Sequence, residues 1–216
     1  MTKIAPSILT ADFGQLDNEI KSIENADYIH IDVMDGVFVP NLSFGFPILE
    51  SVRKSTNKIL DVHLMIKSPS VYAARFAEAG GDIITFHIEA ETPETIMKTI
   101  TDIHNCGKKA GISLKPGTPA EAVYPYIENL DLILVMTVEP GYGGQEFMAE
   151  MLTKITELRE YIDSHNLKCE IEVDGGINID TARLCVAHGA NVLVAGIDVF
   201  KAEDRATHIN ELRSIT

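Results

Sequence analysis

The segment Ile29-His30-Ile31-Asp32-Val33-Met34-Asp35-Gly36 alternates aliphatic residues with polar or sulfur-containing ones and ends in a glycine. Because the side chains of a β-strand point alternately to its two faces, His30, Asp32 and Met34 share one face, and the aliphatic residues form the other. An aliphatic face of this kind suits packing against helices. The segment therefore predicts a buried strand whose second face carries polar groups.

Similar apolar segments recur along the chain, and most of them are bounded by glycine or proline. They alternate with segments of helical pattern, which predicts a parallel sheet. Eight such units favour a closed (β/α)8 TIM barrel of the α/β class. An open doubly wound sheet is the structural alternative, but its GxGxxG motif does not follow the first strand here. The predicted strands are Ile4–Leu9, Tyr28–Val33, Ile59–Met65, Ile83–Ile88, Ala110–Leu114, Leu132–Val138, Glu170–Asp174 and Val192–Ala195.

Several helix ends are marked by residues that favour them. Ser68 and Thr92 each precede a proline, which is the pattern of an N-cap followed by the first helical residue. The segment Thr118-Pro119-Ala120-Glu121 fits a capping box. Gly107 and Gly189 stand where helices should end.

The composition indicates a sizeable core and an acidic surface. Of the 216 residues, 45% are hydrophobic and 23% are charged, and the formal net charge is −14. Such a chain should be repelled by nucleic acid and by anionic membranes. No apolar run approaches the ~20 residues that span a bilayer, and the N-terminal residues lack the pattern of a signal peptide. No linker or low-complexity stretch is present, so we expect a cytoplasmic protein with a single domain over residues 1–216.

Polar residues late in three strands predict a metal site. The carboxyl ends of barrel strands meet at one face, which gathers His30, Asp32, His63 and Asp174. Taken alone, a strand histidine is more often part of the core, and an aspartate before Gly-Gly is more often a turn residue. Together they favour a ligand set, because charges inside a barrel must be paired or ligated. Imidazole and carboxylate ligands suit one divalent Zn, Fe, Mn or Co ion.

Three glycine-rich elements follow the late strands: Pro140–Gln145, Gly175-Gly176 and Gly196. Barrels often bind phosphate through the loops after strands seven and eight. Exposed backbone N–H groups form such a site without lysine, which suits a chain of net charge −14. The alternative is that each glycine serves only a tight turn. Three clusters on adjacent loops favour phosphate.

These motifs resemble the ribulose-phosphate 3-epimerase family over nearly the whole chain, from Ile4 to Phe200. The stretches that carry the resemblance are Ser7–Leu9, His30–Gly36 with Phe38–Asn41, Val62–Met65, Met136–Gln145 and Glu172–Gly176. The resemblance implies an isomerase that interconverts ribulose 5-phosphate and xylulose 5-phosphate in the pentose phosphate pathway. It also implies self-association into a homo-oligomer.

The resemblance implies roles for single residues. His30, Asp32, His63 and Asp174 would hold the metal, and Asp32 and Asp174 would exchange the protons. Ser7 and His63 would contact the sugar. The residues that would hold the phosphate are Gly141, Tyr142, Gly143, Gly144, Asp174, Gly175, Gly176, Gly196 and Ile197.

One departure from the family pattern is the pair Ile197-Asp198, where a serine usually follows Gly196. A contact from the backbone N–H at this position would survive the change, but a hydroxyl contact would not. The carboxylate of Asp198 would oppose a phosphate if it pointed inward. The departure therefore bears on the choice of substrate.

The proposed chemistry needs two acid–base groups. Inversion of a carbon beside a ketone requires that a proton leave one face of a planar enediolate and return to the other, and Asp32 and Asp174 can flank such a plane. A bound metal would stabilise the enediolate, and a dry site would strengthen that effect. Met34, Met65 and Met136 either form a dry cap around the enediolate or simply fill the core.

Alternative functions share part of this pattern. A 3-epimerase for a hexulose phosphate such as allulose 6-phosphate would use nearly the same residues. A lyase would need Asp-x-Lys where this chain has Asp61-Val62-His63, or a Schiff base on Lys115. A non-catalytic sugar-phosphate sensor is a third class. The loop 140–147 is either a closing lid or a rigid phosphate cradle, and His87 and Glu89 either orient ligands or serve structure.

Overall fold

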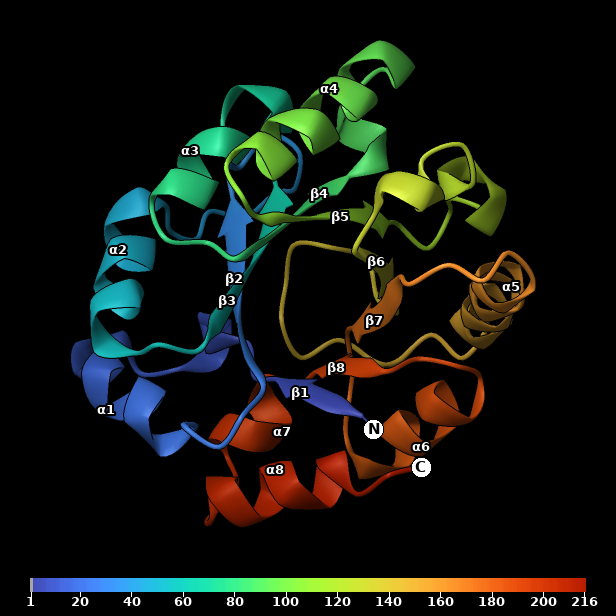
Figure 1. Ribbon diagram of the computed structural model, residues 1–216. Coiled ribbons are helices and arrows are strands. Elements are labelled where there is room, and N and C mark those ends of the chain that lie inside the picture. Colours follow the sequence, from blue (N-terminus) through green and yellow to red (C-terminus); the bar gives the residue numbers. More distant parts are fainter. Residues whose placement is uncertain (1) are drawn as a thin grey trace.

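A computed structural model describes residues 2–216. Within this range, eight parallel strands follow the hydrogen-bonded order β1-β8-β7-β6-β5-β4-β3-β2. The backbone N–H of His30 donates to the carbonyl of Pro6 at 3.0 Å, which joins the two ends of this order. The predicted (β/α)8 barrel is therefore confirmed (Figure 1). The strands are β1 (Lys3–Ala5), β2 (Tyr28–Met34), β3 (Ile59–Met65), β4 (Ile83–His87), β5 (Lys109–Leu114), β6 (Leu132–Met136), β7 (Glu170–Asp174) and β8 (Val192–Val194).

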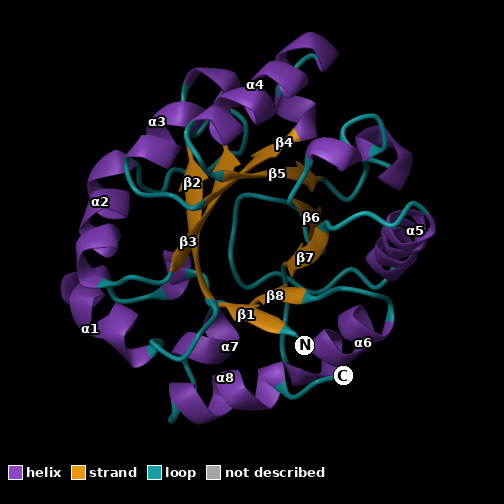
Figure 2. Cartoon of the chain, in the orientation of Figure 1, coloured by secondary structure: helices purple, strands orange, loops and turns teal. Residues whose placement is uncertain are grey.

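Helices form a ring around the barrel (Figure 2). Their apolar faces pack on the aliphatic outer faces of the strands and form the largest hydrophobic cluster of the described residues. The α-helices are α1 (Leu16–Ser22), α2 (Phe46–Ser55), α3 (Ala73–Glu78), α4 (Pro93–Asn105), α5 (Met151–Ser164), α6 (Ile179–Ala187), α7 (Ile197–Phe200) and α8 (Arg205–Arg213). Between β5 and β6 the connection consists of two short 3-10 helices, Ala120–Val123 and Ile127–Asn129.

The ends of several predicted elements differ from the structure. The first strand ends at Ala5 rather than Leu9, because Pro6 has no N–H for the sheet and Ile8–Thr10 form a 3-10 turn. Ser7 caps that turn by accepting a hydrogen bond from the N–H of Leu9 at 3.3 Å. The early end of the strand therefore leaves Ser7 at the mouth of the barrel.

Two of the predicted helix starts are wrong in detail, and one is confirmed. The N–H of Thr92 donates to Thr95 Oγ1 at 2.9 Å, and α4 begins at Pro93 as predicted. Thr118 forms no capping box, because its hydroxyl donates to Glu89 instead. Ser68 has a left-handed backbone, with φ of 56°, and its side chain caps no helix. Gly107 and Gly189 do follow α4 and α6 with positive φ, as helix-ending glycines should.

The interior of the barrel changes from apolar to polar along its axis. Tyr28, Leu132 and Val192 belong to an apolar cluster inside the sheet. Toward the carboxyl ends the interior is polar, and its side chains are fully buried. These polar side chains are His30, Asp61, His63, Thr85, His87, Ser113 and Glu172. The strands thus carry a buried polar layer directly beneath the barrel mouth.

The two ends of the described chain meet, since the hydroxyl of Thr2 donates to the carbonyl of Ile215 at 2.8 Å. Across residues 2–216, no helix combines the length and the apolar character that crossing a membrane requires.

Close approach between β4 and β5 requires a glycine at position 111. A Cβ added to Gly111 would overlap Thr85 Oγ1 and would lie 3.1 Å from Thr85 Cβ. We expect Gly111→Ala to lower the free energy of unfolding by ~1–3 kcal/mol through overpacking, as measured by urea denaturation. In a Thr85→Ala background, two of the three clashing atoms are gone, so the penalty should shrink. Equal penalties in both backgrounds would contradict this account.

Candidate active site

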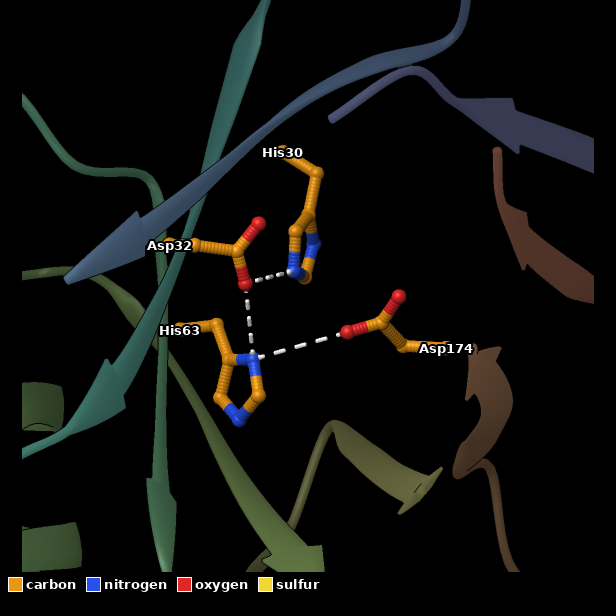
Figure 3. A group of neighbouring side chains, drawn as sticks. All are labelled: His30, Asp32, His63 and Asp174. Carbon is orange, nitrogen blue, oxygen red and sulfur yellow. Dashed lines mark hydrogen bonds and ion pairs between the residues drawn. The ribbon is translucent and has the colours of Figure 1, made fainter. Parts of the chain in front are cut away.

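Four of the predicted site residues converge at the mouth of the barrel (Figure 3). His30 and Asp32 come from β2, His63 from β3 and Asp174 from the end of β7. Asp32 Oδ1 lies 3.2 Å from His63 Nδ1 and 3.4 Å from His30 Nε2. His63 Nδ1 lies 3.9 Å from Asp174 Oδ2. One ligand atom from each residue lies within 4.8 Å of all the others, so the structure brings the four predicted ligands together.

This cluster fits a divalent cation. His30 Nδ1 lies 2.6 Å from Asp61 Oδ2, which leaves His30 Nε2 facing Asp32. That nitrogen is buried and has no hydrogen-bond partner within residues 2–216. Two imidazole nitrogens with two carboxylate oxygens suit Zn, Fe, Mn or Co. Burial opposes a proton on His30, but Asp32 and Asp61 raise the pKa of that ring well above its ordinary value, so cation binding would displace a proton.

The environments of the two aspartates push their pKa values apart. Burial, together with the negative charge of Asp32, raises the pKa of Asp174 to about 6. Burial also disfavours a charge on Asp32, but His30 and His63 outweigh it and hold the pKa of Asp32 well below its usual range. One carboxylate is therefore held ionised, while the other gains and loses a proton close to neutral pH. Separated pKa values of this kind characterise acid–base pairs in active sites.

A cavity opens above the cluster, and the predicted phosphate-binding elements form part of its wall. The wall includes Asp32 and Asp174 from the strands, Ser7 from the turn after β1, and the loop Pro140–Gln145 after β6. Gly175, Gly176, Gly196 and Ile197 complete it from β7 and β8. The backbone N–H groups of Gly144 and Gly176 donate to no other group within the described range. They are therefore available to an anion in the cavity.

The glycines after β7 are required by geometry. Gly175 and Gly176 have φ of +125° and +65°, a region that residues with a side chain rarely adopt. A Cβ on Gly175 would also come within 2.5 Å of the side chain of Val138. The turn that follows Asp174 therefore depends on these two residues.

The departure at Ile197-Asp198 is resolved in part. Asp198 lines the cavity, but its Oδ2 lies 2.5 Å from His208 Nε2 on α8, so one of its carboxylate oxygens is engaged by that histidine. The Ile197 side chain is 36% exposed and lines the cavity beside Gly144. A backbone contact at residue 197 remains open to an anion, whereas a hydroxyl contact is absent.

Met34, Met65 and Met136 are buried in apolar clusters and also line the cavity, so their placement is compatible with both a dry cap and core packing. Lys115, in contrast, is not among the cavity residues. Its ammonium group lies 3.9 Å from the centroid of the Phe38 ring. No lysine of the described chain lines the cavity, which argues against a Schiff-base lyase.

Sequence reasoning assigned no role to two buried acids behind the cluster, Asp61 and Glu172, and it left the role of His87 open. Asp61 contacts His30, and His87 Nε2 lies 2.9 Å from His63 Nε2. Burial lowers the pKa of His87 to about 4. Glu172 is fully buried, and burial and the charge of Asp61 raise its pKa well above the usual range. Strand alternation placed Asp61 and Glu172 on the interior face, two residues before His63 and Asp174, and that signal was available.

The fold and this cluster define a (β/α)8-barrel enzyme whose site lies at the carboxyl ends of the strands. A family model described as the ribulose-phosphate 3 epimerase family matches residues 3–200. The ribulose-phosphate 3-epimerase of Bacillus subtilis (strain 168) is 50% identical over 216 residues, covering 99% of both chains. That of Synechocystis sp. (strain PCC 6803) is 46% identical over 213 residues, covering 98% of this chain and 93% of its own. The chain belongs to the ribulose-phosphate 3-epimerase family and is an isomerase.

Solved structures of lower identity share the fold. The 3-hexulose-6-phosphate synthase from Salmonella typhimurium superposes with a TM-score of 0.75 at 18% identity, covering 99% of this chain and 97% of its own. KGPDC from Streptococcus mutans has a TM-score of 0.73 at 15% identity, covering 100% of this chain and 99% of its own. At these identities the likeness extends to the barrel alone.

The raised pKa of Asp174 predicts a pH-dependent stability in chelator-treated protein. Between pH 3.8 and about 6, the folded state keeps a proton that the unfolded state has lost, so stability falls as pH rises through this window. Asn cannot titrate, so Asp174→Asn should gain stability relative to wild type by up to ~3 kcal/mol from pH 4 to pH 7. Urea unfolding at both pH values measures the difference. Asp163→Asn, on the exposed face of α5, controls for loss of one charge. A difference independent of pH would contradict the shift.

Proposed function

We propose that this chain is a ribulose-phosphate 3-epimerase that interconverts D-ribulose 5-phosphate and D-xylulose 5-phosphate with the aid of one divalent cation. The observation that carries the proposal is the placement of Asp32 and Asp174. They extend from separate strands into one cavity, next to a cluster that fits a cation, and their pKa values lie far apart. The names of the relatives support the choice of substrate.

Two carboxyl groups suffice for inversion at the carbon beside the ketone. One aspartate removes the proton from one face of the substrate, and the other delivers a proton to the opposite face. An ionised Asp32 and a protonated Asp174 form one competent starting state, and exchange of these states allows the reverse reaction. Because a free aspartate is too weak a base for an ordinary C–H, the acidity of the substrate must also be raised.

Asp32 can serve the cation and the proton through different oxygens. Its Oδ1 lies between His30 and His63, whereas its Oδ2 accepts a hydrogen bond from the hydroxyl of Ser7 at 2.6 Å. His30, Asp32, His63 and Asp174 would hold the cation. When bound, it supplies positive charge that stabilises the oxyanion developing as the proton leaves carbon. Met34, Met65 and Met136 would exclude water from the reacting carbon.

The phosphate would bind to backbone N–H groups of the cavity loops, including those of Gly144, Gly176 and Ile197. Local groups of this kind hold an anion despite the net charge of −14. Hydrogen bonds to the loop 140–147 and its flanking residue Glu139 favour a rigid cradle over a closing lid. Asn41 Nδ2 donates to the carbonyl of Gly141 at 2.9 Å, and Gln145 Nε2 donates to the carbonyl of Glu139 at 2.6 Å.

The proposed reaction predicts exchange of one substrate hydrogen with solvent. In D2O, wild-type protein should convert ribulose 5-phosphate to xylulose 5-phosphate and introduce deuterium at carbon 3, as followed by proton NMR. Asp174→Asn should lower kcat by about 10²–10⁴, because one proton-transfer group is lost. A chelator should suppress turnover, and one of Zn, Fe, Mn or Co should restore it.

Asp163→Asn, remote from the cavity, is the control and should match wild type in this assay. Wild-type turnover without deuterium at carbon 3, or an Asp174→Asn variant as fast as wild type, would refute the mechanism. Binding of ribulose 5-phosphate without any turnover would indicate a sensor instead of an enzyme.

The hexulose phosphate alternative has the same chemistry and differs in the length of the substrate. The same assay with allulose 6-phosphate compares the two values of kcat/KM. We expect the larger value for ribulose 5-phosphate, and the reverse order would assign the chain to the hexulose phosphate.

A further inference from the structure

His63 is connected to a chain of buried side chains behind the metal cluster. It is fully buried, and its two ring nitrogens face in opposite directions. Nδ1 points toward Asp32 and Asp174, at 3.2 Å and 3.9 Å. Nε2 lies 2.9 Å from His87 Nε2, on the neighbouring strand β4. At that distance one of the two nitrogens must donate a hydrogen bond and the other must accept it.

Glu89 sets the direction of that hydrogen bond. His87 Nδ1 lies 3.1 Å from Glu89 Oε2, and a carboxylate oxygen only accepts, so the proton of His87 resides on Nδ1. His87 Nε2 is then an acceptor, and His63 Nε2 must carry the proton of that ring. A lone pair on His63 Nδ1 then faces the cluster, where Asp32 Oδ1, 3.2 Å away and also only an acceptor, competes for a proton on that nitrogen as long as no cation is bound. A metal ligand must present such a lone pair.

Glu89 and His87 are themselves held in place. Glu89 Oε1 accepts from the backbone N–H of Lys115 at 2.8 Å and from the hydroxyl of Thr118. The ring of Phe38 packs against His87, with centroids 4.9 Å apart. Residues from the loops after β2 and β5 therefore hold His87, at the end of β4, and Glu89, just after it. Neither side chain can rotate freely.

From this network we propose that His87 and Glu89 are positioning residues that fix the tautomer and orientation of His63, so that its Nδ1 is presented to the cation. The proposal rests on the cation site of the proposed function. The ring of His30 is fixed in a similar way, but by direct contact with a carboxylate, because its Nδ1 lies 2.6 Å from Asp61 Oδ2. His63 receives the same control from Glu89 through an intervening imidazole. Partners of this kind commonly change metal affinity by 10–100-fold.

Glu89→Gln is the sharpest test, because the surroundings fix how the new amide must lie. The donors from Lys115 and Thr118 would engage the amide oxygen, so its NH2 group would face His87 Nδ1. His87 would then carry its proton on Nε2 and donate to His63 Nε2. The proton of His63 would move to Nδ1, the nitrogen that faces the cluster. The substitution thus reverses the hydrogen-bond chain at nearly constant volume.

We expect Glu89→Gln to weaken Zn²⁺ binding by about 10–100-fold, as measured by competition with a chromophoric chelator. In chelator-treated protein, ¹⁵N chemical shifts of His63 should show a larger fraction of the Nδ1–H tautomer in Glu89→Gln than in wild type, because His87 no longer favours a proton on Nε2. Glu94→Gln, on the exposed start of α4, is the matched control and should change neither quantity. An unchanged His63 tautomer with unchanged Zn²⁺ affinity in Glu89→Gln would overturn the proposal.

Two variants of His87 separate positioning from simple packing. His87→Gln keeps an acceptor for His63 and a donor for Glu89, so Zn²⁺ affinity should stay within a few fold of wild type. His87→Leu keeps volume but breaks the chain, so affinity should fall and the added Glu89→Gln should have no further effect. If Gln and Leu weaken binding equally, packing alone explains the effect and the proposal fails.

These readouts do not depend on turnover. Wild-type protein that binds Zn²⁺ and shows the expected tautomers, yet does not epimerise ribulose 5-phosphate, would refute the proposed function alone. A wild-type enzyme that epimerises, with a Glu89→Gln variant of unaltered tautomer and Zn²⁺ affinity, would refute the positioning role alone.

Discussion

The register of β2 against β3 is the constraint on which the site depends. It sets Asp32 opposite His63 and His30 opposite Asp61, so these two buried carboxylates each have an imidazole beside them. A shift of β2 by one residue would turn His30 and Asp32 toward the helices and would leave Asp61 and His63 without these partners. Uncompensated burial of an ion costs on the order of several kcal/mol, so that arrangement is strongly disfavoured. The pairing that stabilises these charges is the same pairing that gathers the cation ligands.

That arrangement also explains how two aspartates of one site acquire different chemistry. Asp32 lies 3.2 Å and 3.4 Å from the two histidines, whereas Asp174 comes no closer than 3.9 Å to His63 and is destabilised as an anion by the negative charge of Asp32. Burial acts on both in the same direction, so the difference arises from the neighbours. A strand order that places β1 and β8 between β2 and β7 keeps the two carboxyl groups on separate sides of the cavity.

The sequence alone predicted the barrel, from eight alternating strand and helix patterns, and the four side chains that converge, from the two-residue period of the strands and their positions late in them. The sequence-based predictions failed where the contact that decides a side chain's role comes from a residue distant in the chain. Thr118 was predicted to cap a helix, but its hydroxyl donates a hydrogen bond to Glu89, which follows another strand. Asp198 was ambiguous because its direction is set by His208 on α8. The role of His87 was left open because alternation gives the face of a strand but not the nitrogen that meets a neighbouring ring.

The candidate cation cluster and the loops proposed to bind phosphate come from different kinds of structure, yet hydrogen bonds hold them at a fixed distance from each other. Strands hold the cluster, whereas loops after β6, β7 and β8 line the rest of the cavity. Thr137, fully buried, joins them: its N–H donates to the carbonyl of Asp174 at 2.8 Å and its hydroxyl to that of Gly175 at 2.6 Å. Its own carbonyl accepts from Met148 at 2.9 Å, which fixes the far end of the β6 loop. In the proposed epimerase, these hydrogen bonds would set the spacing between Asp174 and the phosphate-binding loops, and that spacing would select the length of the sugar phosphate that fits.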